Sequence, residues 1–251
     1  MVKYMNKVVL VTGSSKGIGA EIIKEFAKAG YNCVINYNNS LDSALALNEE
    51  IKKYHIKSLV IKCDVTSEVE VDNMFNQIEK EFGGVDVLVN NAGVDISNVF
   101  SKKELDDFKK TIDVNLFGAY IVSKRASKYM LDNKWGRIIN ISSTNAINTY
   151  YPMCLEYDAS KAALNSLTHN LAIQFAPYIN VNAIAPGFIG TENELEDYDN
   201  EFLKQEVEKI LVRRFGDPKE VAYLVKFLAS GEADFINNTI IRIDGGQYGS
   251  I

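Results

Sequence analysis

Three side chains in the second half of the chain have types and spacing suited to acid–base chemistry: Tyr157, Lys161 and Ser143. Tyr157 and Lys161 stand four residues apart, so on a helix their side chains share one face. An ammonium group beside a phenol, whose ordinary pKa is about 10, favours the phenolate and lowers that pKa. Such a tyrosine can give a proton to a carbonyl oxygen, or take one from an alcohol, near neutral pH. Because a Tyr-x-x-x-Lys pair alone is common, the hydroxyl of Ser143 at an expected strand end is what makes this interpretation specific.

A glycine-rich turn follows the first expected strand and opens the first expected helix. Its glycines permit a close approach of the backbone to a pyrophosphate, whose charge meets the free N–H groups of the helix start. The spacing Gly-x-x-x-Gly-x-Gly differs from Gly-x-Gly-x-x-Gly, and it lacks the Gly-Lys-Ser/Thr ending of a nucleoside-triphosphate loop. It predicts a dinucleotide-phosphate site made by Gly13, Ser14, Ser15, Lys16, Gly17, Ile18 and Gly19.

Polar or glycine-containing segments also follow the next three expected strands. These segments contain Asn36 and Tyr37, then Asp64 and Val65, then Asn91, Ala92 and Gly93. Each could be ordinary turn chemistry, because Asn, Asp and Gly favour turns. Their alignment along one edge of a parallel sheet, where ligands bind, favours a role in holding the rest of a dinucleotide.

Seven short apolar runs alternate with helix-like stretches along the chain. The runs are residues 7–12, 32–37, 58–64, 85–90, 137–142, 179–185 and 239–243. Near-continuous apolar runs of this length are typical of strands that are buried on both faces. Helical periodicity marks residues 18–30, 41–54, 66–82, 108–131, 157–175 and 218–229.

This alternation predicts the α/β class, with a single Rossmann-type, doubly wound parallel sheet of about seven strands and helices on both faces. One dinucleotide-binding and catalytic domain would then span residues 1–251. Residues 188–200 interrupt the alternation, and a long excursion within a tight fold is commonly a lid or a substrate loop. We expect that loop to extend over about residues 188–213.

The amino-acid composition argues against several kinds of binding partner. Lys+Arg 27 against Asp+Glu 33 gives a net charge of −6, which argues against nucleic acid and anionic membranes, since both are held by clustered Lys and Arg. Only three Cys and two His occur and no Cys-x-x-Cys is present, so no metal site is expected. A short polar start and the lack of any apolar run of about 18 residues predict a cytoplasmic protein without a membrane span.

Taken together, these motifs resemble those of the single-domain short-chain dehydrogenases/reductases. The resemblance rests on residues 12–19 and 90–93, on Asn115, Ser143, Tyr157 and Lys161, and on Pro186-Gly187. It continues through residues 214–246, with Gly216, Pro218, Glu220, Val221 and Asp244-Gly245-Gly246. It implies hydride transfer between a nicotinamide and a carbonyl or alcohol carbon. Within the family the chain looks most similar to bacterial 3-oxoacyl-(acyl-carrier-protein) reductases, with sugar and polyol dehydrogenases next.

The resemblance also implies a role for each motif residue. Tyr157 would be the acid/base, and Lys161 would lower its pKa while holding the nicotinamide ribose. Ser143 would orient the substrate oxygen, and Asn115 would bridge through water to a proton relay. Contacts with the cofactor are implied at Tyr157, Lys161, Pro186, Gly187, Ile189 and Thr191.

Two departures from the family pattern occur. Ser143 and Tyr157 are 14 residues apart, one more than in most members, which leaves Ser142 as a rival for the hydroxyl that faces the substrate. Asn237-Asn238-Thr239 stands where relatives often carry a glycine before the last strand.

Three other classes of protein share some of these features. Epimerases and dehydratases use a Tyr–Lys pair, but they generally need a longer C-terminal substrate domain than 251 residues leave. A dinucleotide-sensing regulator would keep the glycine turn without needing Ser143, Tyr157 and Lys161 together. A methyltransferase would want an acid near the end of the second strand, where Asn36 stands. The oxidoreductase is the preferred interpretation.

The substrate pocket should be walled by residues 94–101, 144–156 and 188–213. These segments offer large side chains that favour a partly apolar substrate: Tyr150, Tyr151, Met153, Leu155, Phe188 and Tyr198. Carrier proteins are acidic and should meet basic residues at the mouth. The expected lid instead carries Glu192, Glu194, Glu196, Asp197, Asp199 and Glu201. A carrier-bound carbonyl is therefore preferred only slightly over a small-molecule carbonyl compound.

The second expected strand ends without an acid, since residues 36–40 read Asn-Tyr-Asn-Asn-Ser. Enzymes that use NAD commonly place Asp or Glu there to bind the ribose 2′-hydroxyl, whereas neutral amides and hydroxyls can bind a 2′-phosphate. Lys16 in the glycine turn can supply the counter-charge, so we expect NADP(H) in preference to NAD(H). The resemblance further implies a homotetramer, or a homodimer, built on residues 108–131 and 157–175.

Overall fold

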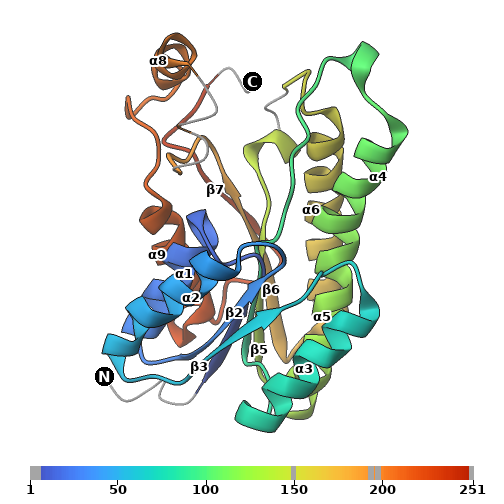
Figure 1. Ribbon diagram of the computed structural model, residues 1–251, viewed down its shortest axis with the longest axis vertical. Helices are drawn as coiled ribbons and strands as arrows, with labels where there is room; N and C mark the ends of the chain where they lie inside the picture. Colours follow the sequence, from blue (N-terminus) through green and yellow to red (C-terminus); the bar gives the residue numbers. More distant parts are fainter. Residues whose placement is uncertain (1–6, 148–150, 192–194, 196–198, 249–251) are drawn as a thin grey trace.

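The computed structural model describes residues 7–147, 151–191, 195 and 199–248. Within this part of the chain, seven parallel strands form one sheet in the order β3-β2-β1-β4-β5-β6-β7 (Figure 1). The strands are β1 (Val8–Val11), β2 (Asn32–Tyr37), β3 (Ser58–Lys62), β4 (Val87–Asn90), β5 (Gly136–Ile141), β6 (Ile179–Pro186) and β7 (Ile240–Ile243). The predicted doubly wound α/β sheet is confirmed, and each expected apolar run forms a strand.

Helices cover both faces of the sheet (Figure 1). One layer contains α1 (Gly17–Lys28), α2 (Leu41–Ile51) and α9 (Pro218–Ala229). The other contains α3 (Glu68–Phe82), α4 (Leu105–Ile112), α5 (Ala119–Asp132) and α6 (Leu155–Phe175). A further helix, α8 (Asn200–Glu208), stands beyond the sheet in the segment between β6 and α9. None of the described helices is long and apolar enough to cross a lipid bilayer.

The strands separate two layers of hydrophobic core. Successive side chains of β1 point to opposite faces, so Val9 and Val11 pack in the layer of α1, α2 and α9. Val8 and Leu10 pack in the layer of α3, α5 and α6. Because all four side chains are buried, the strand reads as a continuous apolar run and not as an alternating one.

The order of strands reverses between β1 and β4. From β1 the chain continues to β2 on one side, whereas from β4 it continues to β5 on the other side. The loops that follow β1 and β4 therefore separate at the carboxyl edge of the sheet. In open parallel sheets this crevice is where ligands bind.

One expected helix is divided. The stretch predicted over residues 108–131 consists of α4 and α5, with a wider π-helical turn, Asp113–Gly118, between them. The apolar periodicity continues through this turn, so the sequence pattern does not predict it. Such turns are frequent at functional sites, and this one contains Asn115.

The unusual Asn-Asn-Thr segment before β7 has a conformational reason. Asn238 has a φ of 61°, in the left-handed region that normally favours glycine. Asparagine tolerates this region better than most residues, and its Oδ1 lies 2.6 Å from Nδ1 of His169 on α6. At this departure from the family pattern, an asparagine thus adopts a backbone conformation that glycine adopts easily.

Candidate active site

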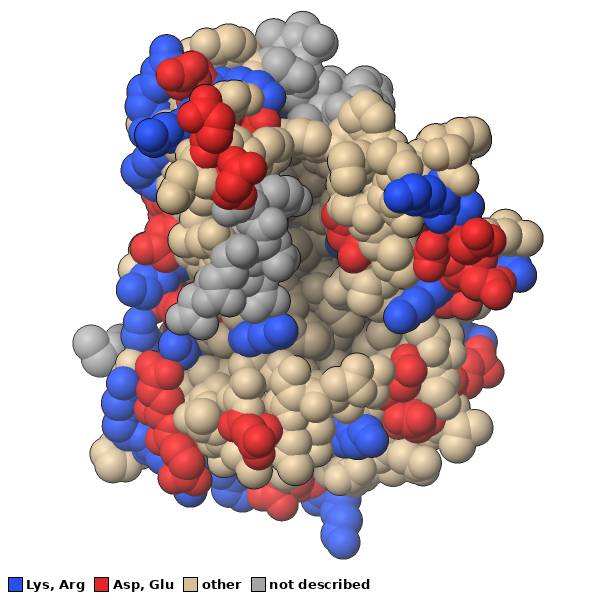
Figure 2. Space-filling view, turned by 45° about the horizontal axis from the view of Figure 1, so that its top comes forward, with Lys and Arg blue, Asp and Glu red and all other residues tan. Residues whose placement is uncertain are grey.

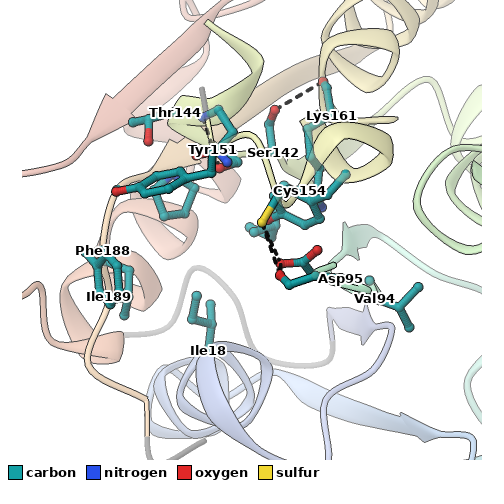
Figure 3. Close-up of a pocket in the computed structure, with 18 of the residues that line it drawn as sticks. Ile18, Val94, Asp95, Ser142, Thr144, Tyr151, Cys154, Lys161, Phe188 and Ile189 are labelled. Atoms are coloured by element: carbon teal, nitrogen blue, oxygen red, sulfur yellow. Dashed lines mark hydrogen bonds between the residues drawn. The ribbon is translucent and has the colours of Figure 1, made fainter. Parts of the chain in front are cut away.

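The carboxyl ends of the central strands open onto a cavity of about 570 Å³ (Figure 3). Its walls come from the loop after β4, the segment between β5 and α6, and the residues that follow β6. Ser143, Tyr157 and Lys161 all line this cavity. The structure therefore brings together the three side chains whose types suggest proton transfer, from the end of β5 and from α6.

Lys161 is the buried cation of this cavity. Its Nζ donates a hydrogen bond to the carbonyl oxygen of Ile141, the last residue of β5, at 2.7 Å. The same Nζ lies 5.4 Å from the centre of the Tyr157 ring. Burial lowers the pKa of Lys161 to about 8, because the charged form loses hydration. The side chain is thus held beside Tyr157 and remains cationic at neutral pH.

The two serines at the end of β5 make different hydrogen bonds. Ser142 Oγ donates to the carbonyl oxygen of Lys161 at 3.4 Å and so connects β5 to α6. Ser143 Oγ accepts the N–H of Asn145 at 3.2 Å, and none of the described groups accepts the hydroxyl proton of Ser143. Ser143 therefore has a proton to donate into the cavity, which supports it over Ser142 as the hydroxyl that faces the substrate.

Asn115 lies behind the wall of the cavity. Its Oδ1 accepts the N–H of Val94 at 2.8 Å, while its Nδ2 donates to the carbonyl oxygen of Val94 and to Oγ of Ser160, each at 3.0 Å. Both amide hydrogens are used within the protein, so this side chain holds the loop after β4 against α6. A water relay at Asn115 can use only the second lone pair of Oδ1 or the backbone carbonyl.

The glycine turn after β1 is braced by neighbouring loops. Gly13 has a φ of 59°, and a Cβ at this position would lie 2.9 Å from Cα of Ala92. The N–H of Gly13 donates to Oδ1 of Asn36, and Nδ2 of Asn91 donates to the carbonyl oxygen of Gly13, each at 3.0 Å. α1 then begins at Gly17 with no acid in its first turn. The turn fits a pyrophosphate, because a bare backbone and a helix N-terminus face the crevice.

A second cavity, of about 660 Å³, lies on the other side of the glycine turn. It is lined by many of the residues predicted to hold the dinucleotide: Gly13, Asn36, Asp64, Val65, Asn91, Ala92 and Gly93. The amide of Asn36 is already engaged, because its Oδ1 accepts from Gly13 and its Nδ2 donates to the carbonyl oxygen of Cys63 at 3.0 Å. Asn38 and Asn39, which also line this cavity, are the amides that can meet a ligand there.

Asp64 shapes the turn that follows β3. Its Oδ1 accepts both the N–H and the Oγ1–H of Thr66, at 2.9 and 2.7 Å. The N–H of Asp64 donates to Oε2 of Glu70 at 2.9 Å. This edge of the second cavity is therefore formed by internal hydrogen bonds before any ligand binds.

The predicted counter-charge, Lys16, is exposed at the start of α1 and lines neither cavity. Two other lysines, Lys109 and Lys110 on α4, line the second cavity. The sequence pattern does not predict them, because they come from a helix far along the chain whose polar face looks like ordinary solvated surface.

The remaining predicted cofactor residues divide into two sets. Ile18, Pro186, Gly187 and Ile189 line the first cavity. Ser14, Ser15, Gly17, Gly19, Tyr37 and Thr191 belong to neither described lining. Thr191 nevertheless lies beside the glycine turn, since a Cβ on Gly17 would be 3.7 Å from its Cγ2.

Three side chains that the sequence patterns do not single out meet on the wall of the first cavity. Oδ2 of Asp95 accepts from Oγ of Ser97 at 3.0 Å and from Sγ of Cys154 at 3.2 Å, and Figure 3 shows the thiol facing the carboxylate. Burial raises the pKa of the Cys154 thiol to about 12, so it stays protonated as a donor. Only the tertiary contact between two distant loops reveals this group.

The expected lid packs against the cavity through α8. Tyr151 donates from its hydroxyl to Oε2 of Glu206, at 2.7 Å, and Phe202 lines the cavity beside Phe188. Figure 2 shows the hollow in this face, with acidic and basic side chains mixed on the rim near α8. Of the predicted wall residues, Tyr151, Met153 and Phe188 line the cavity and Leu155 does not. Outside the described residues lie Tyr150, Tyr198, Glu192, Glu194, Glu196 and Asp197.

The polar groups that line the first cavity include the phenol of Tyr157, the ammonium of Lys161 and the hydroxyl of Ser143, together with further hydroxyl, amide, thiol and carboxylate groups. Among the described residues, no group of three His, Cys, Asp or Glu side chains is arranged to hold a metal ion. A phenol beside a buried ammonium can exchange a proton with an oxygen atom of a ligand. The glycine turn contributes to both cavities, through Gly13 to the second and through Ile18 to the first.

Known proteins share both the sequence and the fold. Residues 7–201 match the family model described as short chain dehydrogenase. The 3-oxoacyl-[acyl-carrier-protein] reductase FabG of Staphylococcus epidermidis is 39% identical over 248 residues, which are 97% of this chain and 100% of that protein. A solved short-chain dehydrogenase/reductase variant from Serratia marcescens has a TM-score of 0.91 and 34% identity, over 96% of this chain and 98% of that one. A 7α-hydroxysteroid dehydrogenase complexed with NADH and 7-oxo glycochenodeoxycholic acid has a TM-score of 0.92 and 32% identity, over 97% and 94%.

Proposed function

Because the chain belongs to the short-chain dehydrogenase/reductase family of nicotinamide-dependent oxidoreductases, we propose that it reduces a 3-oxoacyl group carried on an acyl-carrier protein, with NADP(H) as the preferred cofactor. The observation that carries the proposal is the meeting of Ser143, Tyr157 and Lys161 in one cavity at the carboxyl edge of the sheet. The reaction itself, between a carbonyl and a CH–OH group, is that of the family.

In the proposed reduction, Tyr157 gives its phenolic proton to the carbonyl oxygen of the substrate, and Ser143 donates a second hydrogen bond to that oxygen. Lys161, fixed by the carbonyl of Ile141, keeps a positive charge beside the phenol and so favours loss of its proton. A nicotinamide dinucleotide bound along the glycine turn supplies the hydride. Its pyrophosphate would be held by residues 13–19, and its adenosine by the second cavity.

The preference for NADP(H) follows from the end of β2. No acid stands in residues 36–40, and the amides of Asn38 and Asn39 line the cavity where a 2′-phosphate would lie. The proposed counter-charge for such a phosphate is the exposed Lys16 at the start of α1, and Lys109 and Lys110 on the cavity wall are the other cations available. The test is the ratio of kcat/KM for NADPH and NADH, and equal values would contradict the preference.

The 3-oxoacyl substrate is supported by the relatives named as acyl-carrier-protein reductases and by the apolar part of the cavity wall. A small-molecule carbonyl compound is the second candidate, because Asp199 and Glu201 put negative charge at the start of α8, where an acidic carrier protein would have to dock. A panel of acetoacetyl thioesters, sugars and diketones, followed by cofactor absorbance, distinguishes the two. Turnover of thioesters alone supports the first candidate, and turnover of free ketones or sugars alone supports the second.

We also propose a homotetramer, or at least a homodimer, built on the helices of the α5 and α6 layer. Three large apolar side chains of this layer are strongly exposed in a single chain: Phe117 (50%), Tyr120 (43%) and Ile173 (71%). Burial of such side chains between copies would remove apolar surface from water. A monomer by light scattering at micromolar concentration would overturn this proposal.

A further inference from the structure

Asp95 is a carboxylate in the substrate cavity that the proton-transfer chemistry does not use. Among the described residues that line this cavity, the charged side chains are Asp95 and Lys161. Lys161 is directed to the carbonyl of Ile141 and to the Tyr157 ring. The rest of the lining is apolar, hydroxyl or amide. A bound substrate therefore meets one negative charge that has no part in the family reaction.

The position of this carboxylate is fixed by its neighbours. Ser97 and Cys154 both donate to Oδ2, while Oδ1 has no hydrogen-bond partner among the described residues. The N–H of Asn98 donates to the carbonyl oxygen of Met153 at 3.0 Å, which ties the loop of Asp95 to the segment before α6. Asp95 therefore presents a free acceptor oxygen from a held loop.

Nearby cations do not neutralise Asp95. One ammonium on this loop, that of Lys103, pairs with the fully buried Glu156 and also donates to the carbonyl oxygen of Ile96 at 2.7 Å. No described Lys or Arg forms an ion pair with Asp95. The pKa of the half-buried Asp158 is raised, first by burial and further by the charges of Asp95 and Glu156. The charge of Asp95 also contributes to the raised pKa of Cys154, which lines the cavity.

We infer that Asp95 determines substrate specificity: it accepts a hydrogen bond from a hydroxyl or ammonium group of the substrate and excludes substrates that carry a carboxylate near the reacting carbonyl. The inference rests on the proposed function, because it concerns the substrate of the same site. Asp95→Asn is the variant that isolates the charge, since an amide oxygen can still accept from Ser97 and Cys154.

Two matched pairs of ketones test this role. Levulinate and methyl levulinate differ in a negative charge, and 4-hydroxy-2-butanone and 2-pentanone differ in a hydroxyl in place of a methyl group. Each is assayed with NADPH in the wild type, in Asp95→Asn and in Asp132→Asn. The last variant removes an equal charge from an exposed residue at the end of α5, remote from the cavity.

In the wild type we expect kcat/KM for methyl levulinate to exceed that for levulinate by about 10-fold, as for like charges a few ångströms apart in a partly solvated site. Asp95→Asn should bring the kcat/KM values for levulinate and methyl levulinate close together, chiefly through KM. The wild type should also prefer 4-hydroxy-2-butanone to 2-pentanone, and Asp95→Asn should reduce that preference. Asp132→Asn should leave both ratios unchanged. The KM effect distinguishes contact with the substrate from a structural defect, which would lower kcat for all four ketones alike.

Ratios in Asp95→Asn that equal those of the wild type would overturn the role of Asp95, as would a wild type that reduces levulinate as well as its ester. Failure to oxidise NADPH with any of these ketones and with an acetoacetyl thioester would instead overturn the proposed function. The two failures are therefore distinguishable in one set of assays.

Discussion

The proposed dinucleotide side of the site, around the glycine turn, and the proposed substrate side, around the first cavity, are built in different ways. On the dinucleotide side, the backbone of Gly13 donates to Asn36 and accepts from Asn91, and these bonds join the ends of β1, β2 and β4. On the substrate side, loops from distant parts of the chain meet through isolated contacts, such as Tyr151 with Glu206 and Cys154 with Asp95. In the first region the side-chain amides of Asn36 and Asn91 hold the N–H and the carbonyl group of Gly13, whereas in the second region single side-chain contacts join distant loops.

This difference explains why the family is easier to identify than the substrate. A side chain added at Gly13 would collide with Ala92, so the dinucleotide turn permits little variation. A side chain in the loop of Asp95 can change without disturbing the sheet, because loops carry few of the buried contacts. The two regions should therefore respond differently to substitution.

The largest expected effect is on the dinucleotide side, in Gly13→Ala. A Cβ would lie 2.9 Å from Cα of Ala92, and the φ of 59° disfavours any side chain. We expect the Kd for NADPH, measured by fluorescence titration, to rise by about 100-fold or more, on the order of 3 kcal/mol.

Gly30→Ala is the matched control for this variant. Gly30 also has a positive φ, of 88°, but a Cβ there would meet open space. This control should lose about 1 kcal/mol of stability and keep the wild-type Kd. If both variants bind NADPH like the wild type, the close packing of the glycine turn is not what makes the binding site.

A second prediction concerns the boundary between the two regions, at Lys161. Its pKa is lowered from 10.5 to about 8 in the folded protein, so between these values the unfolded chain binds more protons and stability rises with pH. The free energy of unfolding of the wild type relative to Lys161→Met should therefore increase by on the order of 2 kcal/mol from pH 7 to pH 10. Urea denaturation of both proteins at the two pH values measures this difference in the free energy of unfolding. A difference that stays constant with pH would show that burial does not lower the pKa of Lys161.

A third prediction separates two sources of positive charge for the 2′-phosphate. Lys16→Ala should weaken NADPH binding about 10-fold and leave NADH binding nearly unchanged, because one partly exposed charge contact is lost. Lys110→Ala is the comparison, since Lys110 lines the second cavity from α4. If NADPH binding weakens selectively in Lys110→Ala and not in Lys16→Ala, the counter-charge for the 2′-phosphate comes from α4.

The smallest effect is expected on the substrate side, in Cys154→Ser. The pKa of the thiol is raised to about 12, so at neutral pH it acts as a donor to Asp95, a role that a hydroxyl can take over. We expect kcat/KM to change by less than about 2-fold. Rapid inactivation of the wild type by a maleimide at pH 7, absent in Cys154→Ser, would contradict a protonated thiol.

The sequence predicts most of the sheet, because each buried strand is a short apolar run with turn residues at its ends. It also predicts Tyr157 and Lys161 as a pair, since their spacing on one helix is a local property. The glycine turn is likewise predicted from a run of neighbouring residues. These features need no knowledge of how distant segments meet.

Other features depend on tertiary contacts and could not be predicted. The approach of Cys154 to Asp95 joins residues that are 59 positions apart, and that of Tyr151 to Glu206 joins residues 55 positions apart. The π-helical turn that contains Asn115 has the same apolar periodicity as an α-helix, so the sequence pattern does not distinguish it from one. Such contacts are made by loops, whose geometry is set by the whole fold.

The most direct test of the account is Tyr157→Phe, which removes only the hydroxyl that is proposed to carry the proton. With an accepted ketone or thioester and NADPH, kcat/KM should fall by about 10²–10⁴-fold, while the Kd for NADPH and the urea midpoint stay at wild-type values. Retention of more than about a tenth of the wild-type kcat/KM would contradict proton transfer by Tyr157.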